Sequence, residues 1–525
     1  MNKRLGAAAA LLGLVGMIAA SVSAQSNRSS TLIYGGDWSG LITIDPGMSY
    51  EYAGSLVTNN LYETLVKFEG EDLSTLKPSI ATKWTVSDAG SSWKVVFNLR
   101  NQKFASNRPV TADDVVYSFD RAIAMKGPGS FLFTSVANMK VGSTKAVNKS
   151  TVEVTLPKTA SPAAFLNLLT FNIGAIVDST EVRARAVGND YGATWLKRNS
   201  AGSGPFVLNR WDQNSVVVLD ANPRSRLLPK LERVILREMK EANTQKIALE
   251  SGEIDLADNL TPDMIKVKAS DSKFVVYKAD SLNLQYLGMS AGPDSPFKDA
   301  RVRQAVRFAV DQDGIIASLA GGNARKIQTI IPQGLFGYNA AKPYSVDVEK
   351  AKGLLKAAGK DGGFEVEMLT PQGACLAGIP CADLAAKIQS DLAKIGIKII
   401  IRQLVDSELY PLYRAQKANM LLVDWSPDFP DPDGNATPMS DFGAKSLAWR
   451  NQWNNPEASK LAQMAALEPN PTKRAALYKQ LTELQLEDGP FAVLFQPTVS
   501  VTLNKTVKGY LRNAQNQIRL EKVSK

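Results

Sequence analysis

The sequence predicts an α/β fold divided into two or three domains. Its 525 residues exceed what one hydrophobic core usually organises, since domains of roughly 150 residues are typical. Apolar and polar residues alternate over residues 364–368, as expected of a strand. A helical pattern follows at 382–395, and two further strands are predicted at 397–404 and 419–423. This β-α-β order is typical of a sheet wrapped by helices. The sequence pattern breaks near Ala291, where Pro293 and Pro296 follow. We expect the chain to pass from one domain to the next at this point.

Other segments support the same class. The first strand is predicted at residues 31–34 and a later strand at 211–220. Residues 59–68 are predicted to be a helix with apolar residues on one face. Thr111 is expected to cap a helix, with Asp114 three residues later as in a capping box. Further helices are predicted at residues 243–249, 300–310, 347–358 and 473–486, and a late strand at 493–501 that returns to the first lobe.

The first 24 residues have the pattern of a secretory signal peptide. Lys3 and Arg4 precede an apolar run over residues 5–20, and residues 22–24 fit the small-x-small pattern for cleavage after Ala24. A membrane-anchoring helix is the alternative, but the run is short for the roughly 20 residues that a span needs. We therefore expect an exported, periplasmic protein.

Composition excludes several function classes. The formal charge is +10, but the basic residues are scattered, with no basic run interleaved with aromatics, which argues against nucleic-acid binding. The chain contains no histidine, so Ser-His-Asp triads and HExxH zinc sites are excluded. No catalytic residue, metal ligand or cofactor is therefore predicted. The two cysteines, Cys375 and Cys381, are expected to form a disulfide in an oxidising compartment, with two buried thiols as the alternative.

A loop rich in acidic residues and proline follows the strand at 419–423. Its residues 424–433 contain four carboxylates, two aromatics and three prolines. Rigid loops at strand ends are where α/β folds build ligand sites. A solvated acidic turn is the alternative. A calcium loop is disfavoured, because Ala436 stands where glycine is needed and Phe442 where a bidentate glutamate is needed.

Four motifs together resemble bacterial family 5 extracellular solute-binding proteins, the peptide- and nickel-type binding components of ABC importers. They are residues 62–66 with Ile44, Asp45 and Pro46 before them, residues 110–119, residues 202–206, and residues 299–306. The resemblance covers nearly the whole mature chain. It implies a two-lobe periplasmic-binding-protein architecture with an extra domain in the first lobe and a hinge of two crossover strands. It also implies a non-enzymatic, monomeric receptor that delivers its solute to an inner-membrane ABC permease.

The resemblance also implies boundaries. The first lobe is expected over residues 25–286, with an inserted subdomain at about 60–200. The second lobe is expected over 287–496, and the chain returns to the first lobe over 497–525. Leu284–Met289 and residues 493–499 are the predicted hinge strands.

In peptide-binding members, an aspartate three residues after a tryptophan pairs with the ligand's ammonium group. By resemblance, this pattern falls here on Trp425 and Asp428, with Ser426 and Pro427 beside them and Trp38 and Asp37 on the opposite wall. A buried ammonium needs such a countercharge. Asp428 as a turn residue and Trp38 as core packing are the alternatives. Asp431 and Asp433 are interpreted as turn-forming neighbours.

The chain departs from dipeptide-binding members in one respect. Residues 371–383, where those members would place an arginine for the ligand carboxylate, contain no arginine. A longer peptide, or a solute without a free carboxylate, is therefore favoured. The alternatives are an oligosaccharide stacked on Trp38, Trp425, Trp449 or Trp453, a chelated metal on the same scaffold, and, from a different class, an exported hydrolase.

Overall fold

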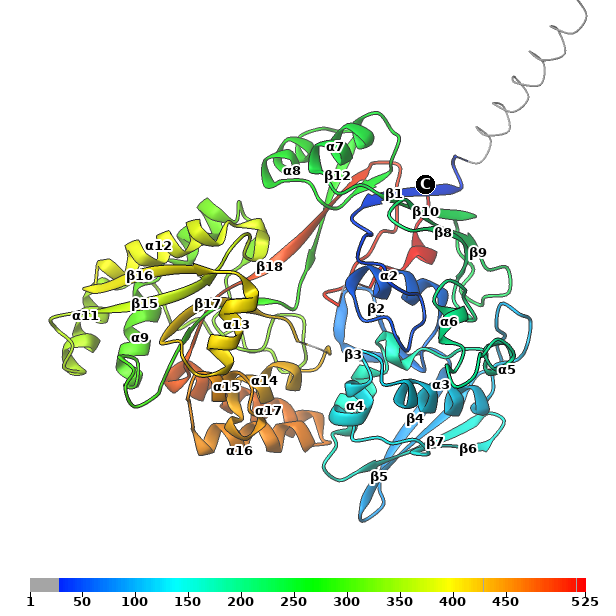
Figure 1. Ribbon diagram of the computed structural model, residues 1–525, viewed down its shortest axis with the longest axis horizontal. Helices are drawn as coiled ribbons and strands as arrows, with labels where there is room; N and C mark the ends of the chain where they lie inside the picture. Colours follow the sequence, from blue (N-terminus) through cyan, green and yellow to red (C-terminus); the bar gives the residue numbers. More distant parts are fainter. Residues whose placement is uncertain (1–27, 428, 516) are drawn as a thin grey trace, which may run out of the picture.

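The computed structural model describes residues 28–427, 429–515 and 517–525. It confirms an α/β fold of two lobes, joined by a long strand, β18 (Phe491–Asn504), that runs from one lobe into the other (Figure 1). The predicted signal peptide lies outside the described residues.

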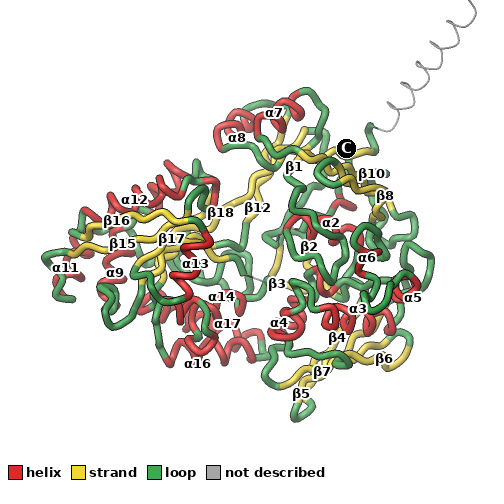
Figure 2. Tube along the Cα trace, in the orientation of Figure 1, coloured by secondary structure: helices red, strands yellow, loops and turns green. Residues whose placement is uncertain are grey.

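The second lobe is built on the predicted β-α-β order. Strands β15 (Phe364–Pro371) and β16 (Ile397–Leu404) are parallel and flank helix α12 (Cys381–Ala393), and β17 (Met420–Trp425) lies parallel to β15. Strand β13 (Leu284–Met289) pairs antiparallel with β17 and with β18. Helices cover the sheet on both faces (Figure 2). These are α9 (Ala300–Ala309), α10 (Gln312–Gly314), α11 (Val348–Ala357), α13 (Asp406–Arg414), α14 (Asp433–Ser440), α15 (Leu447–Arg450), α16 (Pro456–Leu467) and α17 (Pro471–Asp488).

The first lobe holds the opposite half of the same twelve-stranded sheet. Strand β1 (Thr31–Gly36) pairs parallel with β10 (Arg233–Glu238) and β11 (Leu256–Ala257). Strands β8 (Phe206–Asp212) and β9 (Val216–Ala221) form an antiparallel hairpin at its edge. The C-terminal segment packs Ile518, Leu520 and Val523 into this lobe's core.

A third core belongs to a smaller unit within the first lobe. Strands β4 (Ala81–Asp88), β5 (Ser92–Leu99), β7 (Thr151–Pro157) and β6 (Thr144–Asn148) form a separate antiparallel sheet. Helices α3 (Ala112–Met125) and α4 (Pro162–Leu168) pack with it. We call this unit the inserted subdomain; its predicted limits at about 60–200, like the other domain boundaries, stay a prediction. Nearby elements are α2 (Tyr52–Leu61), α5 (Ser179–Ala184), α6 (Ala193–Leu196) and the hairpin of β2 (Val66–Glu69) and β3 (Asp72–Pro78).

The chain crosses between lobes at two places. One is the short link between β12 (Phe274–Asp280) and β13, and the other is the middle of β18. The first residues of β18 pair with β13, and the residues from Thr498 onward pair with β12. Short β14 (Ala324–Arg325) and helices α7 (Ala242–Glu250) and α8 (Pro262–Ala269) flank this region. Hinge motion at these strands stays a prediction.

Two sequence-based assignments are wrong. The predicted helix at 59–68 ends at Leu61, and the chain turns into β2. A side-chain carbon on Gly202 would lie 2.1 Å from the Leu61 carbonyl oxygen, so the glycine segment packs directly against the helix end. The strand predicted over 211–220 is instead the β8–β9 hairpin, turning at residues 213–215.

The motifs that carried the resemblance are mostly structural. Asp114 is buried and accepts hydrogen bonds from the Thr111 amide at 2.8 Å and the Ser179 hydroxyl at 2.6 Å. In the second lobe, the buried guanidinium of Arg303 donates to Phe297 O at 2.7 Å and to Asp488 Oδ1, at the end of α17, at 2.7 Å. Buried polar groups need such partners. These two motifs therefore stabilise the interior of their own lobes, and neither is among the described residues that line the cavity reported below.

Candidate functional site

The loop that follows β17 lies at an edge where ligand sites are common. Strands β15, β16 and β17 are parallel neighbours, so their carboxyl ends meet at the same edge of the sheet. Trp425 ends β17, and its indole N–H donates to Gly434 O at 3.0 Å, closing the loop on itself. Trp425 therefore fixes the shape of the loop.

Asp431 anchors this loop inside the second lobe. Its carboxylate is fully buried and receives two hydrogen bonds from Arg474 of α17, Nη1 at 3.0 Å and Nη2 at 2.6 Å. Arg474 also donates to Tyr478 Oη at 3.0 Å. Asp431 does form the turn, since its Oδ1 accepts a hydrogen bond from the Asp433 amide at 2.9 Å. It is in addition half of a buried, bidentate ion pair, which its polar neighbours in the sequence did not reveal.

The same loop also contacts the first lobe. Asn167 of α4 donates from Nδ2 to Asp431 Oδ2 at 2.6 Å. Phe429, only 7% exposed, packs with the core of the inserted subdomain. The loop thus bridges the two lobes, as its position between α4 and α14 shows (Figure 1).

The carboxyl group of Asp433, at the end of this loop, has a raised pKa. Burial and the neighbouring Asp431 carboxylate raise its pKa to about 6, against 3.8 for an unperturbed aspartate. Its Oδ1 accepts a hydrogen bond from Thr437 Oγ1 at 2.5 Å. The folded state therefore binds more protons than the unfolded state between these values, and stability falls as pH rises through this window.

Asp433→Asn is expected to remove this pH dependence. At pH 7.5 the variant no longer carries the unfavourable charge, so we expect it to be more stable than the wild type. Because Asp433 is partly exposed to solvent, the expected gain is only about 1 kcal/mol, and it vanishes near pH 4. Melting temperatures of both proteins from pH 4 to 8 check this. Asp212→Asn, at an exposed position, controls for loss of one charge. An equal gain at pH 4 and pH 7.5, or none at either, contradicts the assignment.

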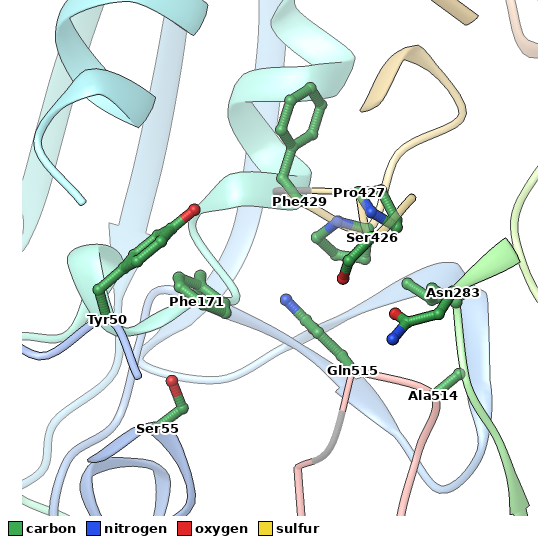
Figure 3. A pocket seen from close by; sticks show the side chains of 11 residues that line it. Tyr50, Ser55, Phe171, Asn283, Ser426, Pro427, Phe429, Ala514 and Gln515 are labelled. Carbon is green, nitrogen blue, oxygen red and sulfur yellow. The ribbon is translucent and has the colours of Figure 1, made fainter. Parts of the chain in front are cut away.

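A cavity of about 330 Å³ lies where this loop, the first lobe, the inserted subdomain and the crossing segment meet (Figure 3). This volume is at the lower end of the range of about 300–1,000 Å³ for small-molecule sites. One wall is aromatic: Tyr50, Phe171 and Phe429 line it, and the rings of Tyr50 and Phe171 are edge-to-face at 6.0 Å. Such a wall suits an apolar side chain of a ligand.

The remaining lining is apolar or neutral and polar. Leu282, Pro427, Pro430 and Ala514 complete the apolar surface. The polar groups come from Ser55 on α2, Asn283 between β12 and β13, Ser426 on the loop, and Gln515 on the C-terminal segment. None of the described lining residues carries a charge. Any countercharge for a charged ligand must therefore come from outside this set.

Only some of the predicted site residues line the cavity. Ser426 and Pro427 line the cavity, and Trp425 lies at the base of their loop. Asp428 lies outside the described residues. Asp37 is exposed on the first lobe, where a hydrogen bond from Ser39 lowers the pKa of its carboxyl. The positions of the tryptophans bear on the oligosaccharide alternative.

None of the four tryptophans named for sugar stacking is among the described residues that line the cavity. Trp38 is 5% exposed, packs edge-on against Tyr34, and donates to Arg237 O at 3.1 Å. Trp453 is buried and donates to Asp488 Oδ2 at 2.9 Å. Trp449 lies on α15, beside the Lys445 ammonium.

The sequence missed Tyr50, Ser55, Phe171, Asn283 and Gln515. They come from four separate segments and follow no shared spacing, so no local pattern could have grouped them. Asn283 offered one signal, because it directly precedes a predicted hinge strand.

Cys375 and Cys381 form the predicted disulfide. Their loop follows β15, at the same sheet edge as Ser426, and the Leu376 amide donates to Gln285 Oε1 at 3.1 Å. The segment that would carry a carboxylate-binding arginine is thus occupied here by a small disulfide-closed loop.

Across residues 28–427, 429–515 and 517–525, no helix has the length and apolarity to span a membrane. Within the same ranges, no group of three or more acidic or cysteine side chains is arranged to hold a metal ion.

Comparison with known proteins defines the class. The family model described as "Bacterial extracellular solute-binding proteins, family 5 Middle" matches residues 75–446, and the chain belongs to this family. The resemblance inferred from the four motifs is thereby confirmed. The cavity between the two lobes agrees with membership in a family of solute-binding proteins.

Individual relatives are similar over nearly their whole lengths. The "Probable D,D-dipeptide-binding periplasmic protein DdpA" of Escherichia coli (strain K12) is 28% identical over 485 residues, covering 90% of this chain and 89% of the relative. The structure of HbpA2 from Haemophilus parasuis has a TM-score of 0.83 at 25% identity, covering 94% and 99%. That of the periplasmic binding protein DppA from Helicobacter pylori, in complex with peptide STSA, has a TM-score of 0.71 at 25% identity, covering 96% and 99%.

Proposed function

We propose that this chain is a periplasmic receptor that captures a short peptide between its two lobes and delivers it to an ABC permease in the inner membrane. The observation that carries the proposal is the cavity itself. It is bounded by both lobes and by the segment that links them, so closing of the lobes would remove a bound solute from water.

The peptide class rests on three supports. Relatives named for dipeptides, and a relative solved with a peptide, share the fold over nearly the whole chain. The lining combines an aromatic wall with neutral hydrogen-bonding groups, which suits side chains and main chain respectively. Asp428, by resemblance, supplies the carboxylate that pairs with the ligand's ammonium group, next to Ser426 and Pro427 on the same loop.

Export is part of the proposal. Residues 1–24 would be a signal peptide cleaved after Ala24, the mature chain would act as a monomer, and it would have no enzymatic activity. The position of the four tryptophans away from the cavity lining weighs against an oligosaccharide ligand.

A thermal-shift panel tests the ligand class. Tripeptides with a free amino group, such as Ala-Phe-Ala, are expected to raise the melting temperature, whereas maltotriose and Ni(II)–histidine are expected to leave it unchanged, because only a ligand that binds the native state stabilises it. Recovery of the peptide intact after incubation separates a receptor from a hydrolase. Stabilisation by maltotriose alone contradicts the proposal.

A further inference from the structure

Gln515 places a hydrogen-bond donor inside the cavity. Its Nε2 atom is buried and has no hydrogen-bond partner among the described residues. In Figure 3 the side-chain amide points toward the centre of the cavity, between the aromatic wall and Ser426. Leaving a buried donor without an acceptor is destabilising and needs an explanation. A ligand acceptor at this point provides one.

The surroundings of Gln515 hold the amide in this position. Thr170, which follows α4, donates from Oγ1 to Gln515 Oε1 at 3.4 Å. The Gln515 amide N–H donates to Asn513 Oδ1 at 3.1 Å. Asn513 in turn is buried and donates to Gln517 Oε1 at 3.1 Å, while Gln517 Nε2 donates to Thr170 O at 2.7 Å. Gln515 and Gln517 are thus both hydrogen-bonded to Thr170, just after α4.

Two more neutral groups face the same space. Ser426 and Asn283 line the cavity, and their side chains make no hydrogen bond to the described residues. Figure 3 shows Ser426 and Asn283 beside Gln515, on the side away from Tyr50 and Phe171. They come from the β17 loop, the link between lobes and the C-terminal segment, so three separate parts of the fold converge there. All three are uncharged.

We infer that Gln515 is a specificity-determining residue that donates from Nε2 to an uncharged carbonyl oxygen of the ligand, with Asn283 and Ser426 serving the adjoining polar atoms. The inference rests on the proposed peptide function and goes further, since it specifies a neutral main-chain amide, not a terminal carboxylate, in this part of the cavity. A carboxylate there would meet no cation among the described lining residues, and a buried unpaired charge is strongly disfavoured. The receptor is therefore expected to accept peptides whose C-terminus is amidated or extended.

Calorimetric titration with Ala-Phe-Ala and its C-terminal amide, Ala-Phe-Ala-NH2, tests the inference. Wild-type protein is expected to bind both within threefold of one another. Gln515→Met, which keeps the size and removes the donor, is expected to weaken both by about tenfold. Gln515→Glu, which offers only acceptors, is expected to weaken them at least as much. Gln304→Met, at a half-buried glutamine of α9 that is not among the described lining residues, is the matched control and is expected to bind like wild type.

The outcomes separate the two claims. Wild-type affinity in Gln515→Met, with unchanged melting temperature, overturns the role of Gln515. Retained affinity in Gln515→Glu together with a loss in Gln515→Met shows that the residue accepts rather than donates, and also overturns it. A loss of 30-fold or more on amidation overturns the neutral-amide assignment. Absence of binding by the wild type to either peptide overturns the proposed function itself, and with it this inference.

Discussion

Replacing Arg474 with methionine is expected to lower the free energy of unfolding by about 3–5 kcal/mol, the cost of leaving one member of a buried ion pair without its partner. Asp431 is fully buried, and both of its oxygens accept hydrogen bonds from Arg474. Methionine fills a similar volume but offers no donor. Chemical denaturation followed by tryptophan fluorescence measures the loss.

Arg233→Met is the matched control, because Arg233 pairs with Asp220 at the surface, where both side chains are partly exposed. Its expected cost is at most about 1 kcal/mol. Adding Asp431→Asn to Arg474→Met is expected to recover part of the loss, since no unpaired charge then remains. If Arg474→Met is no more harmful than Arg233→Met, the anchoring role of Asp431 is wrong.

Replacing Asp428 with asparagine is expected to weaken peptide binding by at least about 30-fold, equivalent to about 2 kcal/mol, as for loss of one partner of a buried charge pair. The described lining of the cavity contains no carboxylate that can substitute for it. Calorimetric titration of Ala-Phe-Ala into the wild type and the variant measures the change.

N-acetylated Ala-Phe-Ala provides the reciprocal test. It lacks the ammonium group, so the wild type is expected to bind it as weakly as Asp428→Asn binds the free peptide, and the two changes together should cost no more than either alone. Asp433→Asn removes a carboxylate five residues away and is expected to keep full affinity. Equal affinity of wild type and Asp428→Asn for the free peptide refutes the ammonium pairing.

Much of the fold could be predicted because it depends on local patterns. The β-α-β order over residues 364–423 reflects parallel strands linked by helices, with buried and exposed residues alternating along β16. The motif around Thr111 and Asp114 marks a helix start that the structure reproduces. The same motifs were recognisable because they build the scaffold. Asp114 and Arg303 satisfy buried polar groups, one in each lobe, a need set by packing and not by the ligand.

The cavity could be predicted only in part, because it is assembled from distant segments. The acidic loop after β17 was found from its proline and aspartate content, but Asp431 proved to be an internal anchor, since only the fold shows that Arg474, 43 residues later, faces it. Phe171 and Gln515 reach the same space through the packing of the inserted subdomain and the C-terminal segment. Nothing in their own neighbourhoods marks them as ligand contacts.

The central claim is that the space between the lobes holds a peptide. Mass spectrometry of the ligand that co-purifies with the protein from its natural host, released by denaturation and labelled with an amine-reactive reagent, tests it most directly. The account predicts short peptides with a reactive free amino group and residue-mass differences along their fragment ions. A series of ions separated by hexose masses, or a metal–chelator complex, would contradict it.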